Sequence, residues 1–410
     1  MTRLFVIAVL SVLTAVPLCV SSQNINTVFD SGVAKMEKKQ WPEAAKDFTF
    51  VTGKDKYYYD AWYNLGLCNV EMKNNDAAIN AFTKAIEAKK DYTEAYLARA
   101  GVYENTGKKK EAAADLDALL KMKPDNIQAW ERKALLNLSQ NNTDAALKDL
   151  SKAIDLKTKN ADTYSQRAEI YLSRKNQTDA LNDLNTAIKL NPSHAGSYDK
   201  RGNIFYSKGE WVNAAADFGK ATELGLKNEG IYEKLADCYY QSGVADKAVE
   251  TFSILLNTYK TRNPVIYRMR GEMYNSAAKY AEAVKDFTKA ISLNQSDYAA
   301  YYGRGYAYSM LGKTKEPMAL RDFNKAIDLK SDAGESYLKR GIYYYDRKKY
   351  DEALQDFSKA VKYSATGEAF FYRGAVYDET GKPDQACQDL KKAASMNYKP
   401  AVERVKSRCP

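Results

Sequence analysis

The sequence predicts an all-α protein in which antiparallel helix pairs stack into a superhelical solenoid. A pattern of 34 residues recurs along most of the 410-residue chain. Within each copy, apolar residues recur at three- and four-residue spacing in two blocks, as on two amphipathic helices. Small residues recur at fixed positions, where helices can approach closely. One such helix pair cannot bury its own apolar face, but stacked neighbours share a continuous core.

The first residues have the pattern of a targeting segment. Arg3 precedes an apolar run from Leu4 to Leu18, and the small residues Ser21 and Ser22 follow. We expect a secretory signal peptide at residues 1–22, cleaved after Ser22. The apolar run is short for a membrane span. A lipid attached at Cys19 and an uncleaved anchor remain as alternatives.

The repeat is visible in short stretches that align with one another. They are WYNLGLCN from Trp62, YLARAGVY from Tyr96, YSQRAEIY from Tyr164, YDKRGNIF from Tyr198, YRMRGEMY from Tyr267, YYGRGYAY from Tyr301 and FYRGAVYD from Phe371. A small residue, a Phe or Leu and usually an Ala follow at constant spacing. Eleven repeats begin near residues 25, 59, 93, 127, 161, 195, 229, 264, 298, 334 and 367. They form an array over residues 23–400.

These residues resemble the tetratricopeptide repeat (TPR) family, whose pattern is W-x2-L-G-x2-Y, then A-x3-F, then P. Trp62, Leu65 and Gly66 agree with it, and Asn69 replaces the Tyr. The resemblance implies a right-handed superhelix made from two helices per repeat, A and B. Residues 401–410 are expected to form a short helix that caps the last repeat.

Two charged positions vary together among the repeats. Position 7 is basic in eight repeats: Arg99, Lys133, Arg167, Arg201, Arg270, Arg304, Arg340 and Arg373. In the same eight, position 23 is an aspartate, counted past two extra residues that the ninth repeat carries around 313–317: Asp115, Asp149, Asp183, Asp217, Asp286, Asp322, Asp356 and Asp389. Where position 7 is Leu65 or Leu235, position 23 is uncharged. We expect ion pairs between helices A and B; a row of arginines that binds an anion is the alternative.

Nothing in the sequence points to catalysis. The single histidine, His194, stands in a loop between two repeats. Metal sites need clustered His or Cys, and phosphate sites need a Gly-rich loop; the pattern of this chain offers neither. We therefore expect no enzyme, no cofactor and no metal.

The four cysteines after the targeting segment fall into two groups. Cys68 and Cys238 occupy the same position five repeats apart, where a small packed residue is expected. Cys387 lies in the last helix B, and Cys409 lies at the end of the capping helix. We expect a disulfide between Cys387 and Cys409, with two free thiols as the alternative.

The TPR resemblance places partner binding on the concave face, at positions 2, 5, 9, 12 and 13. Those positions hold 17 acids and one base, Arg268. Tyrosines among them would be apolar anchors. The candidate site residues are Asp60, Tyr63, Glu71, Glu94, Glu104, Glu131, Asp162, Glu169, Asp199, Tyr206, Glu233, Asp237, Tyr240, Glu272, Tyr302, Tyr306, Tyr345, Asp346 and Asp378.

These acids predict an interaction scaffold that holds a basic protein or peptide segment in an acidic concave groove. The whole chain is nevertheless basic, with a net charge of +10. Its surplus lysines lie mostly on helix B, so the alternative is a docking subunit that binds anionic glycan or lipid head groups with its convex face. Nucleic acid is not expected, and membrane contact would be peripheral. The expected location is the periplasm or envelope of a Gram-negative bacterium, with secretion as the alternative.

Overall fold

A computed structural model describes residues 24–409, so the proposed signal peptide lies outside the described residues. The chain divides into two compact parts, with the boundary between Lys175 and Asn176. The boundary falls inside the fifth repeat, between its two helices. Each part is described by itself below.

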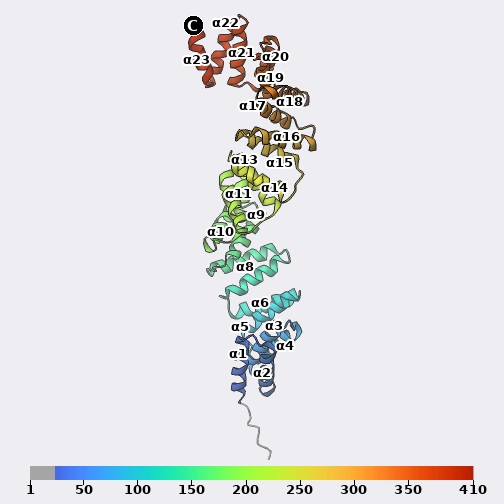
Figure 1. Ribbon diagram of the computed structural model, residues 1–410. Coiled ribbons are helices and arrows are strands. Elements are labelled where there is room, and N and C mark those ends of the chain that lie inside the picture. Colours follow the sequence, from blue (N-terminus) through green and yellow to red (C-terminus); the bar gives the residue numbers. More distant parts are fainter. Residues whose placement is uncertain (1–23, 410) are drawn as a thin grey trace, which may run out of the picture. The chain divides into compact units, whose positions relative to one another are not determined.

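The N-terminal part is a series of helix pairs. Neighbouring helices along the chain contact one another from α1 to α9, and each pair is one repeat (Figure 1). The helices are α1 (Ile25–Glu37), α2 (Trp41–Lys54), α3 (Tyr59–Glu71), α4 (Asn75–Ala88), α5 (Thr93–Asn105), α6 (Lys109–Met122), α7 (Ile127–Leu138), α8 (Thr143–Asp155) and α9 (Ala161–Ser173).

The C-terminal part continues the same alternation and ends in an unpaired helix, α23 (Figure 1). Its helices are α10 (Gln177–Leu190), α11 (Ala195–Ser207), α12 (Trp211–Glu223), α13 (Glu229–Gln241), α14 (Ala245–Asn257), α15 (Pro264–Ser276), α16 (Tyr280–Leu293), α17 (Tyr298–Met310), η1 (Lys313–Lys315), α18 (Glu316–Leu329), α19 (Gly334–Tyr345), α20 (Tyr350–Ser364), α21 (Gly367–Glu379), α22 (Pro383–Ser395) and α23 (Lys399–Arg408). The short η1 accommodates the two extra residues of the ninth repeat. The all-α class and the paired helices predicted from the sequence are confirmed.

The odd-numbered helices from α1 to α21 are the A helices, and each begins at the residue where the sequence places the start of a repeat. The turn from helix A to helix B contains a residue with positive φ at position 15 of all eleven repeats. Gly107 and Gly209 suit this left-handed conformation, whereas Ala278 adopts it at φ 56° with a steric cost. In ten repeats φ lies between 56° and 75°, whereas Gly312 of the ninth repeat has φ 99° and is followed by the short η1.

The core of each repeat depends on two positions of complementary size. Position 24 on helix B is a buried Phe or Leu, and position 8 on helix A is Gly or Ala. A Cβ atom added to Gly66 would lie 2.4 Å from the Phe82 ring, and one added to Gly341 would lie 2.7 Å from Phe357. Glycine thus makes room for the aromatic ring. In the third repeat, position 8 is Ala100 and position 24 is Leu116.

Six of the eight predicted Arg–Asp pairs are confirmed, and all six lie within one repeat. In each, arginine Nε and Nη2 donate to the two oxygens of the aspartate at 2.7–2.9 Å. The pairs are Arg99–Asp115, Arg201–Asp217, Arg270–Asp286, Arg304–Asp322, Arg340–Asp356 and Arg373–Asp389. Arg167 and Asp183 belong to different parts of the chain, so their pairing stays a prediction.

The arginines also reach the preceding repeat, which the sequence analysis did not foresee. Arg340 Nη1 donates to Asn324 at 2.7 Å, and Arg99 Nη1 donates to Thr83 at 2.7 Å. Both acceptors stand at position 25 of the repeat before, a position that is small and polar in most repeats. One guanidinium group therefore joins helix A to two successive B helices.

The predicted pair of Lys133 with Asp149 is wrong. Lys133 Nζ pairs with Asp117, the position-25 residue of the preceding repeat, at 2.6 Å. Asp149 instead accepts a hydrogen bond from Asn137 Nδ2 at 2.8 Å. A guanidinium group can reach positions 23 and 25 at once because its five N–H groups are spread over a planar fork, whereas the compact ammonium group of Lys133 pairs with position 25 alone.

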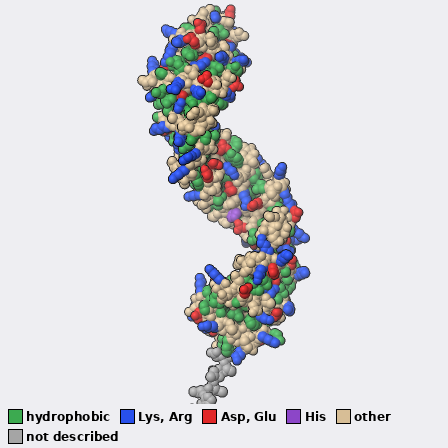
Figure 2. Space-filling view, turned by 90° about the vertical axis from the view of Figure 1, so that its right-hand side faces the viewer, with side chains coloured by type: hydrophobic (Ala, Val, Ile, Leu, Met, Phe, Trp, Pro, Cys, Tyr) green, Lys and Arg blue, Asp and Glu red, His purple; other side chains and the backbone are tan. Residues whose placement is uncertain are grey.

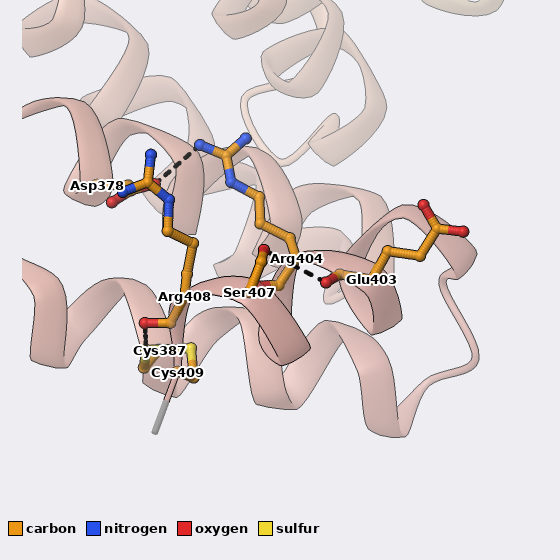
Figure 3. The surroundings of a disulfide bond; sticks show 7 residues. All are labelled: Asp378, Cys387, Glu403, Arg404, Ser407, Arg408 and Cys409. Atoms are coloured by element: carbon orange, nitrogen blue, oxygen red, sulfur yellow. Dashed lines mark hydrogen bonds and ion pairs between the residues drawn. A yellow bond between two sulfur atoms is a disulfide. The ribbon is translucent and has the colours of Figure 1, made fainter.

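The helix α23 covers the end of the C-terminal part. Its Ala401 is buried, and Arg404 donates to Asp378 of α21 at 2.9 Å. Figure 3 shows Arg404 and Arg408 extending from α23 toward Asp378. Cys387 of α22 and Cys409 are joined by a disulfide bond, which is the pairing expected from the sequence. Cys68 and Cys238 are buried free thiols.

Candidate partner-binding site

The candidate site residues lie on the A helices or, for Asp346, directly after one. They differ in how accessible they are. The exposed acids are the ones that a partner could contact without a rearrangement. In the N-terminal part they are Glu71 and Glu94, and in the C-terminal part they are Glu233, Glu335, Asp346 and Glu379. Asp162 and Glu169 are exposed as well, but both make contacts within the chain.

Several other acids are paired with basic side chains of a neighbouring repeat or of the cap. Glu104 accepts from Arg132 at 2.7 Å, and Glu368 pairs with Lys339 at 3.0 Å. Both bases stand at position 6, which is not among the five positions considered in the sequence analysis. Asp378 is occupied by Arg404. The excess of acid is therefore smaller than the five positions alone indicate, and Figure 2 shows acidic and basic side chains interspersed on the face turned to the viewer.

A second group of acids accepts hydrogen bonds from hydroxyl groups. The Tyr206 hydroxyl donates to Asp237 at 2.6 Å, and the Tyr240 hydroxyl donates to Glu272. The hydrogen bond to Asp237, together with burial, raises the pKa of Tyr206 to about 12. Burial and then the bond to Glu272 raise the pKa of Tyr240 to about 12. These two tyrosines hold adjacent A helices together, so their hydroxyl groups are already used within the chain.

Three more predicted acids have similar internal contacts. Asp60 accepts from the Tyr92 hydroxyl at 2.8 Å. Glu131 accepts from Thr158 and Thr163, both at 2.6 Å. Asp199 accepts from Asn203 Nδ2 at 3.2 Å within α11. Their positions were predicted as partner contacts, but their carboxylates stabilise the packing between or within A helices.

The predicted tyrosine anchors also pack against other rings. Tyr63 lies 5.8 Å from Phe82 and 5.2 Å from Tyr92, measured between ring centroids. Tyr345 lies 5.9 Å from Tyr350 and 6.1 Å from Tyr372. Tyr302 and Tyr306 belong to α17 and reach a pocket.

This pocket, which we call the α17 pocket, lies within the C-terminal part and has a volume of about 580 Å³. It brings together the candidate residues Glu272, Tyr302 and Tyr306 with Glu335, an acid at concave position 2 of the tenth repeat. Its walls come from the A helices α15, α17 and α19, the loop before α19 and the end of α20. The remaining lining residues are Asn275, Ser276, Tyr298, Ala299, Gly303, Lys330, Asp332, Ala333, Gly334, Ser336, Tyr363 and Ser364.

The sequence analysis missed the residues that the loops contribute to this pocket. Lys330 and Asp332 lie between α18 and α19, and Tyr363 lies at the end of α20. Counting positions on helix A alone cannot find them. A usable signal was the aromatic content: Tyr298, Tyr302 and Tyr306 recur every four residues and lie on one face of α17.

The described residues contain neither a candidate metal site nor a candidate membrane-spanning helix. No group of three or more His, Cys, Asp or Glu side chains among them could hold a metal ion. None of the helices in residues 24–409 combines the length and the apolar character needed to cross a bilayer.

Sequence profiles described as "Tetratricopeptide repeat" match residues 29–136, 127–194, 232–261, 266–297 and 317–399. The chain belongs to the tetratricopeptide repeat family. Members of this family are typically non-enzymatic scaffolds that mediate protein–protein interactions.

Individual relatives are distant. Superkiller complex protein 3 of Homo sapiens is 31% identical over 84 residues, which span 20% of this chain and 5% of the human protein. Among solved structures, the Cut9–Hcn1 assembly of the APC/C is 12% identical with a TM-score of 0.44 and covers 94% of this chain and 96% of the other. PilF of Pseudomonas aeruginosa is 19% identical with a TM-score of 0.43 and covers 51% of this chain and 94% of the other. Yeast Tom70 is 18% identical with a TM-score of 0.37 and covers 87% and 96%.

Proposed function

We propose that this TPR protein is a scaffold whose A-helix face binds a basic segment of a protein partner. The observation that carries the proposal is the α17 pocket, which opens on A helices and is lined by three carboxylates, four tyrosines and one lysine. Acidic groups attract a basic segment, and tyrosines supply large contact areas at little conformational cost.

The exposed acids of the C-terminal part extend this surface beyond the pocket. Glu233, Asp346 and Glu379 are exposed on or beside α13, α19 and α21. Unlike Asp237 or Glu272, Glu233 and Asp346 can be neutralised without removing a tyrosine–carboxylate bond. Glu379 accepts a long hydrogen bond from the Tyr350 hydroxyl at 3.4 Å, and Glu379→Gln keeps an oxygen that can accept it. They are therefore suitable for a test of binding that leaves the fold intact.

The test compares three forms of the full chain as baits in affinity capture from cell extract. One is the wild type, and the second, the groove variant, is Glu233→Gln, Asp346→Asn and Glu379→Gln. The third is a control with equal charge change on B helices: Glu250→Gln, Glu282→Gln and Asp328→Asn, all exposed. We expect the groove variant to lose basic proteins that the other two retain. Identical captures by all three would contradict the proposal.

An alternative function is supported by one row of exposed lysines. Position 26 on helix B is an exposed lysine in seven repeats: Lys84, Lys152, Lys220, Lys289, Lys325, Lys359 and Lys392. Such a row would bind anionic glycans or lipid head groups. Retention on a heparin column that falls after Lys→Gln changes at Lys289, Lys325 and Lys359, and not in the groove variant, would favour this alternative.

Export remains part of the proposal because of the residues before Gln23. Mass spectrometry of the N-terminus of protein purified from its native cells tests it. A mature chain that begins at Gln23 is the expected result, and a chain that retains Arg3 would contradict cleavage.

A further inference from the structure

The charged groups of the α17 pocket differ in how accessible they are to a ligand. Glu272 is engaged by Arg268 Nη1 at 2.7 Å and by the Tyr240 hydroxyl. Glu335 is exposed at the start of α19. Burial and then the Glu335 carboxylate, through its charge and a hydrogen bond, raise the pKa of Tyr302, so one side of this carboxylate faces the tyrosine. Glu335 is thus a negative group that a ligand can reach.

The lysine of the pocket is itself held by an aromatic wall. Lys330 Nζ lies 4.5 Å from the ring centroid of Tyr298 and donates to its hydroxyl at 3.2 Å. The wall therefore already binds a cation face-on, from within the chain. Among the described residues, no cation lies over the rings of Tyr302 or Tyr306, which stand one and two helical turns further along α17.

A buried acceptor in the pocket wall has no partner. Asn275 Nδ2 donates to the carbonyl oxygen of Gly303 at 3.0 Å, which fixes the orientation of the amide. Asn275 Oδ1 is buried and receives no hydrogen bond from the described chain. Leaving such an oxygen unpaired is costly, but because it is buried a ligand would reach it only after the pocket wall moved.

We infer that the α17 pocket binds the guanidinium group of an arginine side chain from the partner segment, an inference that rests on the proposed function. A guanidinium group is planar, so it can stack on the tyrosine rings, and its five N–H donors are spread over a fork. That fork suits two exposed carboxylates of the pocket, Glu335 on α19 and Asp332 in the loop before it. A lysine ammonium group lacks both the planar face and the spread of donors.

The net charge of the chain makes the test sharper. Because the protein carries +10, a small cationic peptide is repelled on average, and its binding needs a local site. The probe is the blocked peptide acetyl-Gly-Ser-Xaa-Ser-Gly-amide, with Xaa as arginine, lysine or citrulline. Citrulline keeps the shape of arginine and removes its charge. Dissociation constants are measured on the full chain by ligand-observed NMR at about 50 mM salt, where screening is modest.

We expect the arginine peptide to bind about tenfold more tightly than the citrulline peptide, as a charge-assisted hydrogen bond implies. The lysine peptide should fall between them. Glu335→Gln should weaken binding of the arginine peptide about tenfold. The control is Glu233→Gln, which alters an exposed A-helix acid outside the pocket and should leave the dissociation constant unchanged. Equal binding of all three peptides, or equal losses in the two variants, would overturn the inference.

The outcome is separable from that of the proposed function. Glu335 is not altered in the groove variant used for affinity capture. If capture depends on the groove acids while Glu335→Gln does not weaken binding of the arginine peptide, the scaffold function stands and the inference of an arginine pocket is wrong. If the peptide binds as expected and capture is unaffected by the groove variant, the broader acidic surface is wrong and the pocket is retained.

Discussion

Arg340 has three acceptors, and this explains why positions 7 and 23 vary together. Its Nε and Nη2 each donate to Asp356 at 2.8 Å, and Nη1 donates to Asn324. The Asp356 side chain is 5% exposed, so its charge depends on the arginine. A buried pair adds little net stability, but removing one partner leaves a buried charge. Sequence change is therefore tolerated when both partners change.

We expect Arg340→Leu to destabilise the fold by about 3–5 kcal/mol because it leaves Asp356 without its donors. Arg340→Leu with Asp356→Ala should recover a large share, since it reproduces Leu65 and Ala81 of the second repeat. Thermal unfolding of the two single variants and the double variant gives the coupling energy. Purely additive losses would show that the two side chains act independently.

Asp149 offers the opposite case, because it is a buried aspartate without an arginine. Burial, opposed by Lys133 and by the hydrogen bond from Asn137, raises the pKa of Asp149 above its ordinary value of 3.8. With the folded pKa above the unfolded one, ionisation of Asp149 lowers stability above the folded pKa, and this penalty disappears below pH 3.8.

Asp149→Asn should therefore raise the melting temperature at pH 7 by roughly 1–2 °C, and the gain should shrink toward zero as the pH falls to about 3.5. Melting curves across this range measure it. The matched control is Asp356→Asn, which should lower the melting temperature at pH 7 because Arg340 donates to both oxygens of the Asp356 carboxylate. A loss of stability in Asp149→Asn at pH 7 would contradict the explanation.

At the scale of the helix pair, positions 8 and 24 are matched in size in most repeats. Gly66 lies against Phe82, whereas Ala100 belongs to a repeat with Leu116. The same compensation is seen at Gly202 with Phe218, and at Ala134 with Leu150. Two repeats depart from this matching, since Ala236 stands with Phe252 and Gly374 with Leu390, so the other core residues of those repeats must adjust to keep the core filled.

Gly66→Ala should destabilise the N-terminal part by about 1–3 kcal/mol, because the new methyl group would overlap the Phe82 ring. Adding Phe82→Leu should restore much of this loss by creating the combination found at Ala100 and Leu116. Chemical unfolding of the single and double variants measures the change. If the double variant is less stable than Gly66→Ala alone, size complementarity is not what joins these positions.

For the whole molecule, the sequence was sufficient to predict the repeats but not the contacts of the candidate site. Eleven copies average out local ambiguity, so the helix boundaries follow from the period itself. The site depends on contacts between repeats, which a count within one repeat does not contain. Arg132 neutralises Glu104 of the repeat before it, and Lys330 enters the α17 pocket from a loop. The residue type at position 25 could have indicated the contact between repeats. This position is polar in most repeats, but it is Gly219 in the repeat just before the one whose position 7 is Leu235.

The end of the array is where stacking alone is weakest, because a last repeat has a neighbour on one side only. The helix α23 supplies the missing cover, and the Cys387–Cys409 disulfide closes a loop with a sequence separation of 22 residues. A closed loop of this size restricts the unfolded chain by about 3 kcal/mol in the chain-entropy account.

Cys387→Ser with Cys409→Ser should therefore increase amide hydrogen exchange in α23 and α22, and leave α11 to α16 nearly unchanged. A reducing agent should have the same effect on the wild type and none on the double variant. The other thiols are suitable internal controls, because burial raises the pKa of Cys68 to about 11 and that of Cys238 to about 12, and both stay protonated near neutral pH. Unchanged exchange in α23 would mean that Ala401 and the Arg404–Asp378 contact hold the cap without the disulfide, whereas uniform loss of protection through α11 would mean that the cap stabilises the whole C-terminal part.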